Sequence, residues 1–290
     1  MTATTVDLAE MIRVETPAGG FRHDLRAVRV VWQREMIRFT RDRLRMVTSL
    51  IQPVLFLFVL GTGLSTITNG TARNVNFRTF MYPGALSMAV LFTAMFSAAS
   101  IVWDREFGFL REMLVAPVSR WSIVVGKCFG GATTAALQGV IILALAGLVG
   151  VPYSLSLILV VFAEMLLLAF TLTAFGVMTA ARITQFQSFM ALNQMLLMPL
   201  FFLSGALFPL GNLPGWLRVL TRIDPLTYAV DPVRRAVFAH LNVPATIMAK
   251  LNPGVTWGGW RVPTGVELLL VAAMGVGMLA IGIWQFKSVD

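Results

Sequence analysis

Candidate metal ligands are scarce in this chain. The sequence has one Cys, Cys128, and two His, His23 and His240, which lie far apart. Metal sites built on Cys or His need several such ligands at short spacing, and a disulfide needs a second Cys. We therefore expect no metal site, no disulfide within the chain and no cofactor bound by the chain itself.

Two short motifs resemble nucleotide-binding or catalytic sequences but lack essential residues. Gly126-Lys127 is similar to the end of a phosphate-binding loop, yet Trp121 occupies the position of the first glycine and Cys128 replaces the Ser or Thr. Ser204 lies in an apolar run that contains no His to act as its base. The residues therefore predict that the chain is not an enzyme and has no nucleotide site of its own.

One acidic residue, Glu164, interrupts the otherwise uncharged run 154–181. A carboxylate near the middle of a membrane costs several kcal/mol unless it is paired or hydrated, so it either marks a transport pathway or bonds to a polar side chain of a neighbouring helix. Methionines such as Met195 and Met198 are adaptable enough to line the same pathway. An ion-gradient-driven secondary transporter or channel that uses Glu164 is therefore one possible function.

The elements that position these residues follow from the composition, which is 57% hydrophobic and 13% charged with a mean hydropathy of +0.77. Soluble domains carry about 25% charged residues, and disordered chains have low hydrophobicity. About 20 apolar residues cross a bilayer. Six long apolar runs therefore predict an all-α integral membrane protein with six transmembrane helices, at residues 47–64, 80–103, 128–151, 154–181, 183–217 and 268–286.

Residues 1–46 contain no apolar run suited to a cleaved signal peptide, so we expect them to remain as a cytoplasmic N-terminal segment. Within it, arginines dominate residues 22–45 while Leu25, Val28, Trp32, Met36 and Phe39 recur every three or four positions. This pattern predicts an amphipathic interfacial helix with its arginines toward lipid phosphates. We assign the net charge of +9 to contact with membrane lipids rather than nucleic acid.

The distribution of basic residues predicts the orientation. Of the 23 Lys and Arg, 15 fall in the N-terminal segment and the connections on its side of the membrane, against 8 on the other side. The positive-inside rule therefore predicts a multi-pass protein of the plasma (inner) membrane with both termini cytoplasmic. Residues 47–286 then form the transmembrane domain, and residues 287–290 form a cytoplasmic tail.

Two connections have features of their own. The cytoplasmic connection 104–120 has charges of alternating sign, with Phe107, Leu110 and Leu114 on one helical face and Pro117 to end the helix; it is either a solvated turn or a helix that docks on a cytoplasmic partner. In the outer segment 208–264, Asp224-Pro225 and Asp231-Pro232 each place a capping carboxylate before a proline. We expect one or two short re-entrant or interfacial helices there.

These connections also carry a family resemblance. The sequence FMYPG at residues 80–84, with DREFGFLREMLVAPVSR at 104–120 and Gly126-Lys127, resembles the ABC-2 type permeases of ATP-binding-cassette exporters. The segments SGALFPL at 204–210, LPGWL at 213–217 and DPLTYAV at 224–230 resemble the same family. The daunorubicin-resistance and Nod-factor exporter branch fits best.

The resemblance implies a permease subunit that moves a drug, lipid or glycolipid out of the cell. It implies two separate ATPase subunits that bind ATP and Mg²⁺, and a second permease that is either another copy of this chain or a homologue. It identifies 104–120 as a coupling helix that contacts the ATPase through Glu106, Phe107, Leu110, Arg111, Glu112, Leu114, Pro117 and Arg120. It identifies part of 208–264 as outer re-entrant helices.

Overall fold

The computed structural model describes residues 20–63, 77–109, 118–211, 213–241, 251–257 and 259–287. The regular secondary structure of these residues is helical apart from a two-stranded hairpin, β1 (Thr256–Trp257) and β2 (Trp260–Arg261). Six helical segments are long and apolar enough to cross a membrane: Arg43–Gly63, Phe77–Glu106, Arg120–Ala144, Leu155–Ala180, Phe186–Leu203 and Thr264–Phe286. The predicted all-α membrane fold is confirmed.

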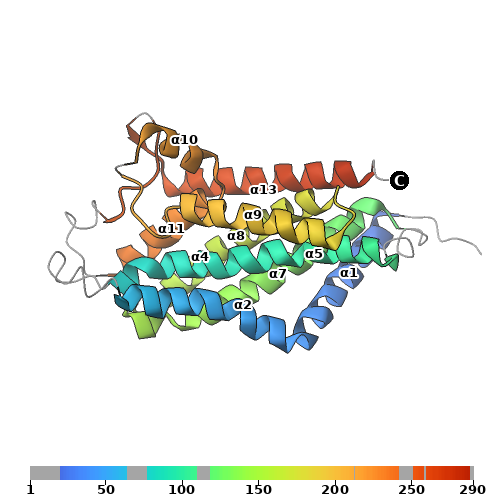
Figure 1. The fold of residues 1–290 in the computed structure, drawn as a ribbon, viewed down its shortest axis with the longest axis horizontal. Helices are drawn as coiled ribbons and strands as arrows, with labels where there is room; N and C mark the ends of the chain where they lie inside the picture. The colour runs from blue at the N-terminus through green and yellow to red at the C-terminus, as the bar shows by residue number, and fades with distance from the viewer. Residues whose placement is uncertain are drawn as a thin grey trace, which may run out of the picture.

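The long helices lie roughly side by side, so the bundle has two distinct ends (Figure 1). One end carries α1 (Phe21–Arg41) and the last turn of α13 (Thr264–Lys287), and the opposite end carries α10 (Gly215–Ile223) and α11 (Thr227–Ala239). An even number of spans accounts for this arrangement, because it returns the chain to the side on which α1 lies.

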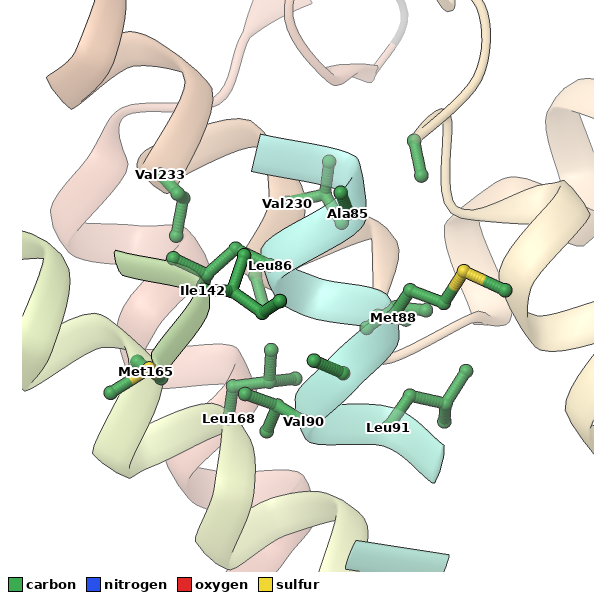
Figure 2. Close-up of a cluster of buried hydrophobic side chains, with 14 of the residues drawn as sticks. Ala85, Leu86, Met88, Val90, Leu91, Ile142, Met165, Leu168, Val230 and Val233 are labelled. Carbon is green, nitrogen blue, oxygen red and sulfur yellow. The ribbon is translucent and has the colours of Figure 1, made fainter. Parts of the chain in front are cut away.

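The helix α4 (Phe77–Ser97) forms the centre of the bundle, and almost all of its residues are buried. Figure 2 shows its side chains surrounded by Ile142 of α7 (Arg120–Ala144), Leu168 of α8 (Leu155–Ala180) and Val230 of α11. The uniformly apolar sequence of α4 is typical of a helix enclosed on all sides. It continues into α5 (Ala99–Glu106), so a single long span reaches the charged residues at its end.

The predicted N-terminal helix ends earlier than its basic pattern indicated. It stops at Arg41. After Asp42 comes α2 (Arg43–Leu55), and the π-helical turn η1 (Phe56–Leu60) continues it; together they form most of the first span. An Asp42 carboxylate oxygen accepts a hydrogen bond from the backbone N–H of Arg45, which satisfies an otherwise unbonded N–H of the first turn. The helix of the first span therefore begins at Arg43, before the predicted span start at residue 47.

Two other predicted boundaries also change. The third span begins at Arg120 and ends at Ala144, before the 3₁₀ turn η2 (Ala146–Val149), so Lys127 lies inside the span rather than before it. The long apolar run 183–217 forms only one span, α9 (Phe186–Leu203), which continues through Pro199. The helix ends at Leu203, and just after it Gly205 has a φ of 72°, a conformation that glycine adopts without strain.

Within its described residues, the segment 208–264 contains the helices α10 and α11, and only α11 begins near a predicted start. The Asp224 carboxylate accepts hydrogen bonds from the Leu226 N–H and the Thr227 hydroxyl at the start of α11. The predicted helix start at Asp231-Pro232 was wrong, because both residues lie inside α11. The Asp231 carboxylate instead accepts bonds from the Arg235 side chain and the Val255 N–H, so it joins α11 to the chain before β1.

Candidate functional site

A buried cluster of charges lies where α1, α5 and α7 meet. The Lys127 ammonium on α7 donates hydrogen bonds to Asp104 of α5 at 2.6 Å, to Ser100 of α5 at 3.1 Å and to Glu35 of α1 at 3.2 Å. Arg34 of α1 donates to the same Asp104 oxygen at 2.5 Å. Lys127, Asp104 and Glu35 are each at most 8% exposed. All three protons of the Lys127 ammonium therefore have an acceptor, as a buried charge requires.

Asp104 is the first of three consecutive charged residues that each hold a different element. Arg105 donates to the backbone carbonyls of Ala181 and Ile183, which follow α8. The Glu106 carboxylate accepts a bond of 2.6 Å from the backbone N–H of Phe186, the first residue of α9. A carboxylate at a helix N-terminus is favourable because it satisfies a free N–H and opposes the helix dipole. The end of α5 is therefore bonded to α1, α7, the end of α8 and the start of α9.

Close backbone packing adds to the contact between α1 and α7. A Cβ atom at Gly126 would lie 2.7 Å from the Val31 Cβ, and one at Gly130 would lie 2.7 Å from the Glu35 Cβ. The Gly126-x-x-x-Gly130 spacing thus forms a close-packing face, as such spacings do in membrane helices, and its neighbour is α1. The side chains of Trp32 and Thr133 are also hydrogen bonded across this contact, at 3.1 Å.

A further bond joins the start of α1 to the start of α7. The Asp24 carboxylate accepts a hydrogen bond of 3.1 Å from the backbone N–H of Ser119, the residue before α7. Hydrogen bonds from the Ser119 side chain and backbone lower the pKa of Asp24, because they favour its charged form. This contact and the Lys127 cluster secure α1 to α7 at two places along its length.

The predicted coupling residues are only partly described by the structure. Glu106 ends α5 and Arg120 begins α7, whereas Leu110, Arg111, Glu112, Leu114 and Pro117 lie outside the described residues. The Phe107 ring packs against Trp103 with ring centres 4.7 Å apart, yet its side chain stays 56% exposed. Phe109 is 50% exposed. Two aromatic side chains therefore face outward beside the segment 110–117.

The structure does not bring the three predicted pathway residues together. Glu164 is buried in α8, and its Oε2 atom has no hydrogen-bond partner among the described residues. Met195 and Met198 lie on the outward side of α9, at 66% and 42% exposure. Glu164 therefore faces the interior of the chain, whereas the two methionines face away from it.

Sequence reasoning missed the Lys127 cluster. It gave Asp104, Lys127 and Glu35 no paired role, although Asp104 ends one uncharged run and Lys127 falls near the start of the next. Opposite charges at facing ends of successive spans were the available signal. The third partner, Glu35, has no such signal, because only the folding of α1 against α7 brings it to Lys127.

The end of the bundle opposite α1 has its own buried charge, Arg234 of α11. Its guanidinium donates to the carbonyls of Gly205 and Ala206 at 2.7 and 3.2 Å and lies 4.5 Å from the centre of the Phe80 ring on α4. Burial lowers the pKa of Arg234 to about 10. Burial also raises the pKa of Asp224 to about 7, despite the hydrogen bonds that Asp224 accepts. These contacts join α11 to the turn after α9 and to the outer end of α4.

Most of the chain matches one protein family. Residues 26–238 match the ABC-2 type transporter family. The chain belongs to this family. The match runs from α1 to the last turns of α11, so it includes the Lys127 cluster and the Arg234 contacts. An ABC-2 permease domain contains no nucleotide-binding site, and the family implies an ATPase subunit as partner.

Three relatives illustrate the range of this permease's similarity. It is 31% identical to ycf38 of Cyanophora paradoxa, which carries the name of a transport permease, over 71% of this chain and 72% of the relative. It is 28% identical to nodulation protein J of Rhizobium leguminosarum bv. trifolii, over 72% and 80% of the two chains. It is 25% identical to the inner membrane transport permease YadH of Escherichia coli, over 75% and 85%. This chain is therefore a multi-pass membrane permease subunit of an ABC-2 transporter.

Proposed function

We propose that this permease exports a hydrophobic or amphipathic substrate (a drug, a lipid or a glycolipid) from the cell, driven by ATP hydrolysis in separate subunits. Two ATPase subunits would bind ATP and Mg²⁺ at the cytoplasmic face. Two permeases, either two copies of this chain or one copy and a homologue, would enclose the pathway between them. Family membership and the six spans support the proposal.

The observation that carries this proposal is the Lys127 cluster. The coupling segment 104–120 begins with Asp104 and ends with the first residue of α7, and Lys127 of α7 bonds directly to Asp104. A force applied to this segment would therefore reach α5 and α7 together, and Glu35 and Arg34 would carry it to α1. Packed elements move as units between discrete arrangements, so these helices would shift together when the ATPases close.

We propose that residues 104–120 themselves contact the ATPase. Phe107 would enter a groove of the partner together with Leu110 and Leu114, and Pro117 would end the helix. Arg111, Glu112 and Arg120 would set its angle. Glu106 has a different part, because its carboxylate bonds to Phe186 at the start of α9 and so extends the connection to a fourth helix. The exposed Phe107 side chain is the described feature that supports such a contact.

We propose that the N-terminus and the C-terminus both lie on the cytoplasmic side of the membrane. The bundle end that carries α1 also carries the end of α13 (Figure 1). The arginines of α1 and the excess of basic residues in the connections at this end favour the cytoplasmic side. The family resemblance to inner membrane permeases is consistent with a position in the plasma (inner) membrane.

Reconstitution tests the function. Vesicles that contain this chain and its ATPase subunits should accumulate a lipophilic fluorescent substrate when ATP is supplied, and should not do so with a non-hydrolysable ATP analogue. Accumulation driven by a proton or sodium gradient in the absence of ATP would contradict the proposal.

A second function, ion-gradient-driven transport through Glu164, has one observation in its favour. The Oε2 atom of Glu164 is buried without a hydrogen-bond partner among the described residues, and unpaired carboxylates within membranes commonly serve ion pathways. In the exporter, Met195 and Met198 would line the substrate pathway from the outward side of α9, whereas Glu164 would stay in the interior of the chain. The Glu164→Gln variant distinguishes the two functions, because it would abolish gradient-driven transport but leave ATP-driven export largely intact.

A further inference from the structure

A polar cavity of about 390 Å³ opens at the elbow between α1 and α2. Its walls come from α1, α2, α4, α5, α7 and α9, and they include hydroxyl, amide and charged side chains. The lining residues that bear on its chemistry are Glu35, Arg38, Asp42, Arg45, Thr93 and Phe96. Its volume falls in the range of sites that bind small molecules.

The charges of this cavity are not balanced. The Glu35 carboxylate forms an ion pair with Lys127, so its charge is compensated, whereas the Asp42 carboxylate accepts a bond from the neutral backbone N–H of Arg45 and keeps its charge. The guanidinium groups of Arg38 and Arg45 form no ion pair with any described residue. Arg38 has only the face of Trp103 beside it, at 6.0 Å from the ring centre. The cavity therefore presents two guanidinium groups against one uncompensated carboxylate, that of Asp42, and has an excess of one positive charge.

A buried hydroxyl deeper in the cavity also lacks a partner. The Thr93 Oγ1 atom on α4 makes no hydrogen bond within the described residues, although Thr93 is only 7% exposed. A buried polar atom normally has a hydrogen-bond partner, so the cavity is suited to a ligand that supplies one. Thr93 lies on α4 and the two arginines on α1 and α2, so such a ligand would contact both sides of the cavity.

An apolar surface adjoins these polar groups. The Phe92 and Phe96 rings on α4 line the same cavity, with ring centres 6.3 Å apart. The helix α1 that forms the rim is amphipathic and basic, a type of helix that lies in the headgroup region of a membrane. Cations at the headgroup level beside an apolar wall match an anion attached to a hydrocarbon chain.

We propose that this cavity binds the anionic headgroup, a phosphate or a carboxylate, of a membrane amphiphile. The headgroup accepts hydrogen bonds from Arg38 and Arg45 and reaches Thr93, and the chain of the amphiphile lies against Phe92 and Phe96. Guanidinium groups suit this role because they present several donors to phosphate or carboxylate oxygens. The site lies within one permease chain, and occupancy requires neither the ATPase nor a second permease, so the proposal does not rest on the transport function.

The test measures binding of a fluorescent phosphatidic acid to the purified full-length chain in phosphatidylcholine nanodiscs. The Arg38→Gln/Arg45→Gln variant should bind at least about tenfold more weakly, because a hydrogen bond to a charged group contributes about the free energy of a tenfold change in affinity. Thr93→Val, which keeps the side-chain shape, should weaken binding as well. The matched control is Arg29→Gln/Arg41→Gln, which removes the same charge from exposed positions of α1 outside the cavity and should bind as the unaltered chain does.

Four results would overturn the proposal. Equal losses in the control and the cavity variant would indicate adsorption to the basic surface of α1. Unchanged binding by Thr93→Val would place the headgroup outside the cavity. Competition by soluble glycerol 3-phosphate as strong as that by unlabelled phosphatidic acid would show that the site takes a free anion. Equal competition by phosphatidylcholine and phosphatidic acid would show that the site does not select anions.

Discussion

The Lys127 ammonium lies 2.6 Å from the Asp104 carboxylate, and both groups are buried. This bond joins the last turn of α5 to α7, the two helices on either side of the segment 104–120. Buried ion pairs often contribute little net stability, because desolvation offsets the attraction of the charges. What this pair provides is a fixed geometry, in which α5 and α7 cannot separate without exposing charges to the apolar interior.

Removal of Lys127 should therefore be costly. The Lys127→Met variant leaves the Asp104 and Glu35 carboxylates buried with fewer partners, and we expect the free energy of unfolding to fall by about 3–5 kcal/mol. Thermal unfolding in detergent measures this loss. The triple variant Lys127→Met/Asp104→Asn/Glu35→Gln should recover much of it, since it removes the buried charges as well. Equal instability of the single and triple variants would show that the cost comes from packing rather than from unpaired charge.

The contact between α1 and α7 depends on two glycines. In Gly130→Ala the new Cβ would lie 2.7 Å from the Glu35 Cβ, and we expect a loss of about 1–3 kcal/mol from overpacking. Gly277→Ala is the matched control, because it lies in the helix α13 with nothing within 4 Å of the added methyl group. The change in melting temperature relative to the unaltered chain should differ in sign or size between the two variants. Equal changes would show that α1 does not pack against α7 as described.

The pH dependence of stability should reveal the titration of the Asp224 carboxyl group. Because burial raises its pKa in the folded protein to about 7, above the ordinary value of 3.8, the folded state holds a proton that the unfolded chain releases. The stabilisation is therefore fully present below pH 3.8 and is lost as the pH rises through 7. The melting temperature should fall between pH 5 and pH 8 by less in Asp224→Asn, whose Oδ1 atom still accepts the hydrogen bond from the Leu226 N–H. An identical fall in both proteins would contradict a buried, protonated Asp224.

Topology can be tested with single cysteines placed at exposed described positions in a Cys128→Ala background. A cysteine at Trp216, on α10, should react with an impermeant reagent in intact cells, and one at Phe109, after α5, should react only after the membrane is opened. Cys128 is the one cysteine of the sequence, so its replacement leaves the introduced cysteine as the single thiol that can be labelled. The reverse labelling pattern would invert the proposed orientation.

The sequence predicted the spans well because a long uncharged run has few alternatives in a membrane. It predicted a helix start near Asp224 for a similarly local reason, since a carboxylate before a proline favours a helix start, and the Asp224 carboxylate bonds to the Leu226 N–H just before α11. It failed at Asp231, where the same local pattern was overruled by bonds to Arg235 and to Val255, which lies more than twenty positions away along the chain. The pairing of Lys127 with Glu35 could not be predicted for the same reason, because α1 is near α7 only in the fold.

The central claim is that an ATPase drives this permease through residues 104–120, and Leu110→Asp tests it most directly. The measurement is co-purification of the ATPase together with substrate-stimulated ATP hydrolysis in vesicles. A carboxylate buried without a partner at the contact costs several kcal/mol, so the account predicts that both readouts fall while the six spans still insert. Glu112→Arg should have a smaller effect, because solvent and salt screen a charge at the rim. Unaltered values of both readouts in Leu110→Asp would show that residues 104–120 form only a turn and would contradict the coupling mechanism.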